Sequence, residues 1–173
     1  TLRHRTLVAT VMSNLALDRK VEELGGQVVR TQVGDRYVVE EMRRGQYSLG
    51  GEQSGHLVYL EHATTGDGML AALKLLGVMR RTGAKLSELR QLLVPYPQAT
   101  VNVAIRVRRP LEEIDSLQRA IAQVERELGR DGRVLVRLSG TEPKARVLVE
   151  GPDAQRIAAW AADIAKEIGR ALG

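Results

Sequence analysis

The sequence predicts two adjoining domains, an α/β domain followed by a smaller α+β domain with an antiparallel sheet, and three observations support this. Residues 1–93 alternate short apolar runs with helical patterns, which is typical of strands in a parallel sheet. Pro95-Tyr96-Pro97 then interrupts the pattern, because a residue before proline disfavours helical backbone. Beyond it, apolar and polar residues alternate strictly, which indicates a strand with one packed face. We therefore predict domains at 1–93 and 97–173.

Composition narrows the class of protein. A chain of 173 residues is long enough for one ordinary domain or two small ones, and without phenylalanine its core must be aliphatic. The net charge of +5 is spread evenly, with 13 basic and 10 acidic residues before position 94 and 13 and 11 after it. This even spread, without a basic tail, argues against nucleic-acid binding. With no cysteine, disulfides and thiolate metal sites are excluded.

Neither a membrane-spanning apolar run nor a signal peptide is recognisable in the sequence. We therefore expect a soluble, cytoplasmic protein that does not bind membranes. The chain starts without methionine and passes almost at once into the apolar run 6–12, which we interpret as the mark of a fragment.

The first domain is expected to open with a buried strand at 6–12, whose apolar residues do not alternate. Ser13 or Asn14 can cap the next helix, and Gly25-Gly26 ends it. The apolar face of that helix comprises Leu17, Val21 and Leu24. The remaining predicted elements are a strand at 27–31, a helix at 37–44, a strand ending at Leu60, and helices at 69–83 and 86–93.

Residues 50–60, GGEQSGHLVYL, form a glycine-rich loop with polar side chains that leads into an apolar strand. Loops at the strand ends of an α/β sheet commonly bind ligands. In an extended backbone Glu52, Ser54 and His56 share one side, and a carboxylate, a hydroxyl and an imidazole suit a polyhydroxylated ligand such as a sugar. The alternative is an ordinary surface hairpin loop. Further on, Asp67 is interpreted as a helix cap rather than a metal ligand.

In the second domain, Val101, Val103, Ile105 and Val107 are expected to face the core from one strand. Pro110 precedes a helix that Gly129 ends, and Pro152-Asp153 opens the last one. The predicted apolar stripe of the first helix is Leu111, Ile114, Leu117, Ile121, Val124 and Leu128. That of the second is Ile157, Trp160 or Ala161, Ile164, Ile168 and Leu172, which makes Trp160 a core residue. Together these patterns predict strand, helix, strand, loop, strand, helix.

Residues 133–150, RVLVRLSGTEPKARVLVE, place a turn of small residues between two apolar runs, with an arginine on each side. The hydroxyl groups, the backbone N–H groups around Gly140 and the guanidinium groups can all donate to one anion. The donors in this predicted anion site are Arg137, Ser139, Gly140, Thr141 and Arg146. A plain strand-turn-strand with solvated charges is the alternative, because Ser, Gly and Thr are also common turn residues.

The motifs GGEQSGH at 50–56 and RLSGTEPKAR at 137–146 resemble the α-D-phosphohexomutase superfamily and, within it, the bacterial phosphoglucosamine mutases. TVMSNL at 10–15, VGDRYV at 33–38 and TTGDG at 64–68 resemble the same family, so the similarity extends over nearly the whole chain. Gln53 favours this subfamily over phosphomannomutases and phosphoglucomutases.

The resemblance implies that the two domains are the third, truncated at its start, and the fourth of a four-domain enzyme, the fourth having a fold like that of the TATA-binding protein. It implies that Glu52, Ser54 and His56 bind sugar hydroxyls, and that the predicted anion site holds the non-reacting phosphate. The reaction implied is the interconversion of glucosamine 6-phosphate and glucosamine 1-phosphate, on the route to cell-wall precursors. It would proceed through a phosphoserine and a bisphosphorylated sugar.

The serine loop and the loop of Mg²⁺-binding aspartates of that family are absent from these residues. The resemblance therefore implies no catalytic and no metal-binding residue here, and the missing N-terminal domains become necessary partners. Two alternatives remain, a phosphomannomutase or phosphoglucomutase relative and a non-catalytic module that binds sugar phosphates. A nucleic-acid binder is the weakest reading, since fold does not transfer function.

Overall fold

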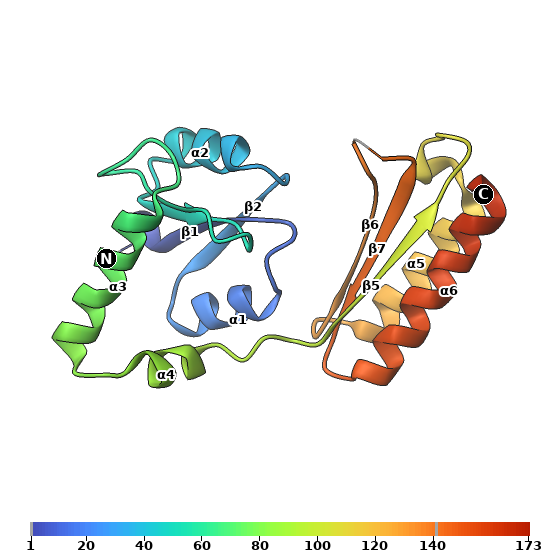
Figure 1. Ribbon diagram of the computed structural model, residues 1–173. Coiled ribbons are helices and arrows are strands. Elements are labelled where there is room, and N and C mark those ends of the chain that lie inside the picture. Colours follow the sequence, from blue (N-terminus) through green and yellow to red (C-terminus); the bar gives the residue numbers. More distant parts are fainter. Residues whose placement is uncertain (1, 141) are drawn as a thin grey trace. The chain divides into compact units, whose positions relative to one another are not determined.

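The computed structural model describes residues 2–140 and 142–173. The chain divides into two compact units, the first ending at Pro95 (unit 1) and the second beginning at Tyr96 (unit 2). Each unit has a hydrophobic core of its own. Both are coloured along the sequence in Figure 1.

Unit 1 alternates strands and helices, as the apolar runs predict. Its elements in chain order are a 3₁₀ turn at Arg3–Arg5, β1 (Thr6–Thr10), α1 (Ala16–Glu23), β2 (Gln27–Thr31), α2 (Asp35–Arg44), β3 (Leu49–Gly51), β4 (Leu57–Tyr59), α3 (Gly68–Thr82), α4 (Leu86–Leu89) and a 3₁₀ turn at Arg90–Leu92. The predicted helix at 86–93 is therefore shorter than expected and tightens into a 3₁₀ turn.

The sheet of unit 1 has the order β2-β1-β3-β4. β1 pairs in parallel with β2 and with β3, whereas β4 runs antiparallel to β3. The expected parallel pairing is thus confirmed for β1, β2 and β3, whereas β4 departs from it. The reason is the short connection between β3 and β4, since a parallel pair requires a crossover of a dozen or more residues.

One face of this sheet is closed by α2, which lies above the strands in Figure 1. Val8 and Val58 from the sheet and Val38 and Met42 from α2 are fully buried there. The helix packs directly over Gly50, where a Cβ would lie 2.6 Å from the Met42 sulfur. Any larger residue at position 50 would push α2 away from the sheet.

The opposite face of the sheet is less completely covered. Leu49, Leu57 and Tyr59 border two cavities of roughly 650 and 330 Å³ on this face. α3 buries none of its side chains fully, and Met69 and Leu73 are 74% and 60% exposed. The helical spacing of α3 is confirmed. The apolar face predicted for α1 is wrong at Leu24, which is 79% exposed because it lies past the end of that helix.

Two predicted helix caps are present. Asn14 accepts a hydrogen bond from the backbone N–H of Ala16 at 3.0 Å. Asp67 accepts one from Leu70 N–H at 2.9 Å, which assigns this carboxylate to the start of α3. Such caps stabilise a helix by about 1 kcal/mol because they satisfy N–H groups that lack an intrahelical partner.

Unit 2 has the predicted order of elements. It comprises β5 (Gln98–Ala104), a 3₁₀ turn at Leu111–Glu113, α5 (Asp115–Leu128), β6 (Arg133–Leu138), β7 (Lys144–Glu150) and α6 (Ala154–Leu172). The sheet order is β5-β7-β6 with both pairs antiparallel. This is an antiparallel sheet with two helices on one face, and the fold-class prediction is confirmed.

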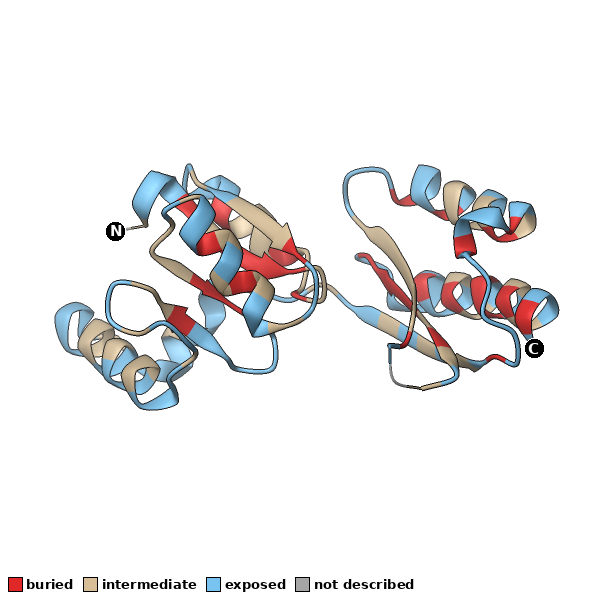
Figure 2. Cartoon of the chain, turned by 90° about the horizontal axis from the view of Figure 1, so that it is seen from above, coloured by how far each residue is buried: buried red, intermediate tan, exposed pale blue. Residues whose placement is uncertain are grey.

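The two helical stripes of unit 2 meet the sheet and form its core (Figure 2). In α6, Ile157, Ile164, Ile168 and Leu172 are at most 1% exposed. Each buried aliphatic side chain contributes about 1.5–3 kcal/mol, so this helix is a main source of the unit's stability. Trp160 packs against the core while partly exposed, with the Arg156 guanidinium 4.6 Å from its ring centre.

The strand prediction fails at Val107, which is 57% exposed. β5 ends at Ala104, and from Arg106 onward the backbone bonds to the end of α6. Ile105 N–H donates to Pro143 O at 3.0 Å and Arg106 N–H to Leu172 O at 2.7 Å. The bond to Pro143 continues the register of β5 with β7, whereas the N–H groups of Arg106 and Val107 both donate to Leu172 at the end of α6.

Candidate ligand-binding loops

The first candidate site is the loop 52–56, which closes the hairpin of β3 and β4. The Glu52 N–H donates to His56 O at 3.0 Å, and the Gly55 N–H donates to Glu52 O at 3.1 Å. Gly55 has φ of 94°, a left-handed conformation that favours glycine. The loop is thus a tight turn, and the extended backbone assumed for this segment is wrong.

The turn nevertheless brings the three predicted sugar-binding residues together. Ser54 Oγ lies 2.9 Å from His56 Nδ1 and 3.5 Å from a Glu52 carboxylate oxygen. The second Glu52 oxygen accepts the Gly34 N–H at 2.8 Å, which ties this loop to the segment after β2. Glu52 is therefore mostly buried, whereas the Ser54 and His56 side chains are open to solvent.

This trio offers hydrogen-bond acceptors and donors on one small surface. A carboxylate accepts only, a hydroxyl does both, and a neutral imidazole has one donor and one acceptor nitrogen. Such a set matches adjacent hydroxyls of a sugar, each of which donates one bond and accepts another. Because Glu52 is already anchored by Gly34, its other oxygen, which accepts the Ser54 hydroxyl, is held in place before a ligand arrives.

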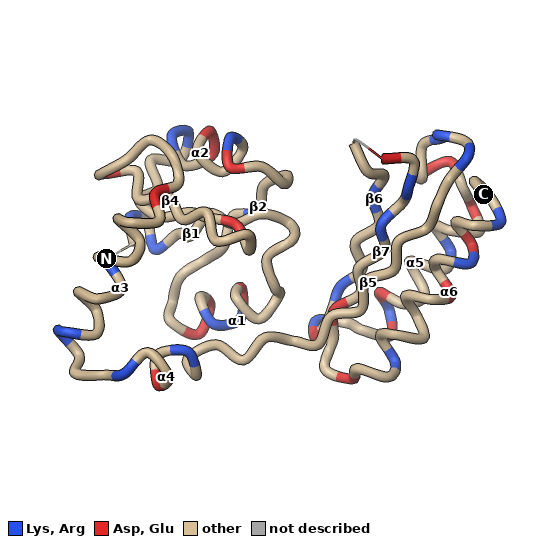
Figure 3. The backbone as a smooth tube through the Cα atoms, in the orientation of Figure 1, with Lys and Arg blue, Asp and Glu red and all other residues tan. Residues whose placement is uncertain are grey.

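The second candidate site lies where β6 and β7 are joined. Arg137 on β6 and Arg146 on β7 stand directly opposite each other in the sheet, and Asn102 of β5 is opposite Arg146 on its other side. They occupy the sheet face opposite to the residues that pack on the helices. Figure 3 shows the basic positions along β6 and β7. Like charges directly opposite are destabilising, so this pair favours an anion between them.

Each of these arginines also has a donor that no described residue accepts. The Nε atoms of Arg137 and Arg146 are buried, and neither has a hydrogen-bond partner among residues 2–140 and 142–173. An unsatisfied buried donor costs about 1–3 kcal/mol, more when charged. Because the two residues are in register on neighbouring strands, they form a candidate place for an oxyanion to supply missing hydrogen bonds.

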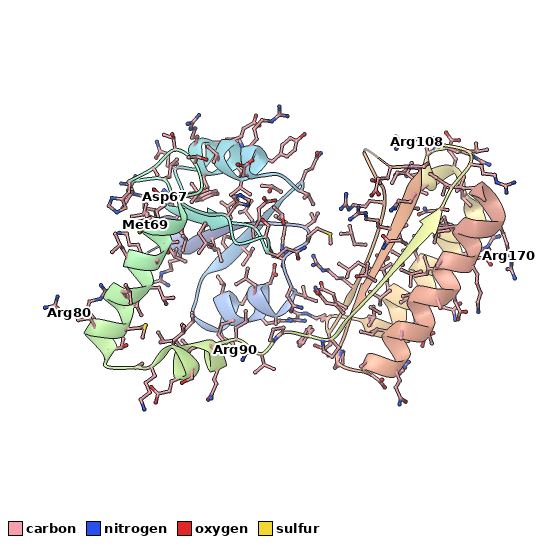
Figure 4. All side chains as sticks on the ribbon, viewed as in Figure 1. Asp67, Met69, Arg80, Arg90, Arg108 and Arg170 are labelled. Carbon is pink, nitrogen blue, oxygen red and sulfur yellow. The ribbon has the colours of Figure 1, made fainter. Side chains whose placement is uncertain are left out.

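The connecting loop is braced independently of these arginines. Ser139 is 4% exposed, its N–H donates to Lys144 O, and its Oγ accepts the Glu142 N–H at 3.2 Å. From the other side, Arg108 donates to Ser139 O at 2.5 Å and to Glu142 O at 3.2 Å. Figure 4 labels Arg108 near this end of unit 2. Among residues 2–140 and 142–173, no acceptor for the Ser139 O–H is found, so this hydroxyl can donate to a ligand.

A carboxylate of the loop lies among the cations. Glu142 contacts the Lys144 ammonium at 2.8 Å and the Arg146 guanidinium at 3.0 Å. The hydrogen bond from Lys144, together with that from Arg146, holds the pKa of Glu142 below its ordinary value of 4.5. The loop therefore carries an internal anion in the absence of a ligand.

Gly140 and Thr141 complete the predicted donors. A Cβ at Gly140 would meet no atom within 4 Å, so packing of the described residues does not require glycine there. Thr141 lies outside the described residues.

Three residues of this site were not predicted from the sequence: Arg108, Glu142 and Lys144. Glu142 and Lys144 belong to the RLSGTEPKAR motif, so the signal was an acidic and a basic residue inside an anion-binding loop. Arg108 belongs to none of the motifs in the sequence. Its role depends on the turn after β5, which no local pattern reveals.

Within residues 2–140 and 142–173, no cluster of three or more His, Asp or Glu side chains is arranged to hold a metal ion. The helices described also include none whose length and apolar character would allow it to cross a membrane.

Comparison with known proteins places these loops in context. The family profile for "Phosphoglucomutase/phosphomannomutase, alpha/beta/alpha domain III" matches residues 1–96, and that for the C-terminal domain of the same family matches 101–167. Phosphoglucosamine mutase from Anaeromyxobacter sp. (strain Fw109-5) is 62% identical over 173 residues, which is all of this chain but 37% of that relative. The chain thus spans little more than a third of the length of this relative.

Solved structures show the same fold. N-acetylphosphoglucosamine mutase from Aspergillus fumigatus superposes with a TM-score of 0.83 at 20% identity, covering 96% of this chain and 38% of that one. The structure of that enzyme in complex with GlcNAc-6P and magnesium superposes with a TM-score of 0.78 at 17% identity, covering 97% and 39%. The profile matches and the 62% identity together show that this chain belongs to the phosphoglucomutase/phosphomannomutase family of α-D-phosphohexomutases and carries its third and C-terminal domains.

Proposed function

We propose that this chain is the C-terminal part of a phosphoglucosamine mutase, which interconverts glucosamine 6-phosphate and glucosamine 1-phosphate. The observation that carries the proposal is the 62% identity to a curated phosphoglucosamine mutase across the whole chain. Both candidate binding loops lie within the matched residues. The reaction would pass through a phosphoserine and a bisphosphorylated sugar.

In this proposal the loop 52–56 binds sugar hydroxyls through Glu52, Ser54 and His56. The contacts among these three side chains, and the Gly34 anchor on Glu52, support the assignment. The residues proposed to hold the non-reacting phosphate are Arg137, Ser139, Gly140, Thr141 and Arg146. The two buried guanidinium Nε donors without partners support this part.

The domains proposed are 1–93 for sugar binding and 97–173 for phosphate binding. We assign the phosphorylated serine and the Mg²⁺ site to other parts of the longer enzyme. A metal there would neutralise charge on the transferring phosphoryl group. The residues of this chain would bind and orient the substrate, and none of them would react with it.

A division of labour between two loops suits this reaction. The sugar must be accepted in two orientations, so that either phosphate reaches the serine. Charge-assisted bonds from arginine hold a phosphate firmly whatever it is attached to, whereas the other loop would recognise hydroxyls common to both orientations.

The test compares the 173-residue chain with the longer polypeptide that also contains the other domains. Each is assayed with glucosamine 6-phosphate and Mg²⁺ in a coupled measurement of glucosamine 1-phosphate. We expect turnover by the longer protein only, and faster turnover than with glucose or mannose phosphates. Turnover by the short chain, or a preference for the non-amino sugars, would contradict the proposal.

A substitution links that activity to the proposed phosphate loop. Arg137→Ala in the longer protein is expected to weaken substrate binding severely while the serine can still be phosphorylated. Arg170→Ala is the control, because it also removes one positive charge from unit 2. Arg170 is 74% exposed on α6, which covers the other face of the sheet, and its ion pair with Glu167 lies within the same helix.

A further inference from the structure

The Glu142 carboxylate occupies donors that a phosphate would need. One oxygen lies 2.8 Å from Lys144 Nζ and the other 3.0 Å from an Arg146 guanidinium nitrogen. Lys144 and Arg146 are two residues apart on β7 and therefore share a sheet face. Carboxylate and phosphate oxygens accept the same charge-assisted hydrogen bonds, so the two anions compete for these cations.

The backbone of Glu142 is fixed, but its side chain is not enclosed. The N–H bonds to Ser139 Oγ, and the carbonyl accepts bonds from Arg108 and from Lys144 N–H. The side chain, by contrast, is 42% exposed. It can therefore rotate into solvent without disturbing the loop.

The ion pairs of Glu142 also leave the site incompletely neutralised. They do not reach Arg137, and the Nε atoms of both arginines stay without a partner among the described residues. A phosphate has more acceptor oxygens than a carboxylate and carries up to one more negative charge. An incoming phosphate can thus satisfy donors that Glu142 leaves unused.

We propose that Glu142 is a displaceable internal counter-ion, which neutralises Arg146 and Lys144 in the free protein and moves aside when the phosphate of a ligand enters. This inference rests on the proposed phosphate-binding role of the loop. It adds a means of releasing the phosphate, because the Glu142 carboxylate re-forms its ion pairs with Lys144 and Arg146 as the phosphate leaves. In a mutase whose bisphosphorylated intermediate must turn around, readily reversible phosphate binding is an advantage.

The test titrates inorganic phosphate into the 173-residue chain at constant ionic strength and pH 7.5, following the backbone amide signals of Ser139 and Gly140 by NMR. Glu142→Gln keeps the size and an acceptor oxygen but removes the charge. We expect phosphate to bind this variant about threefold to tenfold more tightly, which corresponds to the loss of two half-exposed ion pairs that compete with it.

Glu127→Gln is the matched control. Glu127 is a similarly exposed carboxylate of unit 2, at 38%, and its ion pair with Arg156 at 2.9 Å lies on the helices. The Glu127→Gln substitution removes the same charge from unit 2 as Glu142→Gln, so any general effect of net charge on phosphate affinity appears in both variants.

The outcomes separate the two proposals. Tighter binding by Glu142→Gln but not by Glu127→Gln supports the counter-ion. Equal or weaker binding by Glu142→Gln, with phosphate still bound by the parent chain, overturns the counter-ion alone. If phosphate shifts no amide signal of the loop in the parent chain, the proposed phosphate site itself fails and the counter-ion with it.

Discussion

Arg133 and Arg137 lie four residues apart on the same face of β6, yet we expect their replacement to have opposite effects. Arg133 donates to Glu150, which is fully buried and also accepts a bond from Gln98. Arg137 faces Arg146, and its Nε has no partner within residues 2–140 and 142–173. The first arginine is satisfied by the fold, and the second is held ready for a ligand.

Replacing each arginine with methionine keeps much of the aliphatic stem and removes the charge. For Arg137→Met, relief of a like-charge cross-strand pair predicts a gain of about 0–1 kcal/mol in the free energy of unfolding. Loss of charge-assisted bonds worth about 1.5–3 kcal/mol predicts phosphate affinity lower by about tenfold to 150-fold. For Arg133→Met, loss of the charged donor to the buried Glu150 carboxylate predicts a loss of about 3–5 kcal/mol of stability, with phosphate affinity unchanged in the folded variant.

Urea unfolding monitored by tryptophan fluorescence measures the first quantity, because Trp160 is the only tryptophan of the chain and packs against the core of unit 2. NMR titration with phosphate measures the second. If Arg137→Met were destabilised by more than about 1 kcal/mol while binding phosphate normally, Arg137 would be a structural residue, and the reasoning that assigns it to a ligand would be refuted.

Further outcomes follow from the two loops. Gly140→Ala should leave the unfolding midpoint unchanged, since a Cβ there meets no atom within 4 Å. It should nevertheless weaken phosphate binding, because the added methyl group intrudes on the site. Unaltered phosphate binding would contradict this expectation. Glu52→Ala should lower the stability of unit 1 by about 1–2 kcal/mol, because the Gly34 N–H loses its acceptor. Glu52→Gln keeps an acceptor oxygen and should not lower it. If both variants lost the same amide-exchange protection, the proposed anchoring of Glu52 by Gly34 would be wrong. Lys144 and Arg146 lower the pKa of the Glu142 carboxyl in the folded protein. Glu142 should therefore stabilise the loop at pH values above its unfolded pKa, and this contribution should be lost as the pH falls through the folded pKa. A carbon-detected NMR titration of Glu142 with a midpoint at or above 4.5 would contradict the ion pairs.

Elements with a continuous amphipathic stripe were predictable from sequence. The stripes of α5 and α6 correctly identified most of the unit 2 core, because burial of one helical face is a local, periodic signal. Predictions failed where distant segments decide the outcome. Val107 continues the alternation of β5, yet the N–H groups of Arg106 and Val107 donate to Leu172 at the end of α6.

In the candidate site, too, local patterns were predictable from sequence, whereas contacts between distant segments were not. The three polar residues of the loop 52–56 were predicted together for the wrong reason, since a turn and not an extended backbone unites them. The opposition of Arg137 and Arg146 depends on strand register, to which the turn motif gave only an indirect guide. The Arg108 brace could not be predicted, because its two acceptor carbonyls are more than 30 residues away in the sequence.

The most direct measurement is the binding of glucosamine 6-phosphate to the 173-residue chain, followed by NMR at the Ser139, Gly140 and Glu142 amides, with glucosamine as the ligand without phosphate. We expect saturable shifts with the phosphorylated sugar, none at these amides with glucosamine, and none with the phosphorylated sugar when Arg137 and Arg146 are both replaced by methionine. Shifts of equal size with both sugars, or shifts that persist in the double variant, would contradict the assignment of this loop to phosphate.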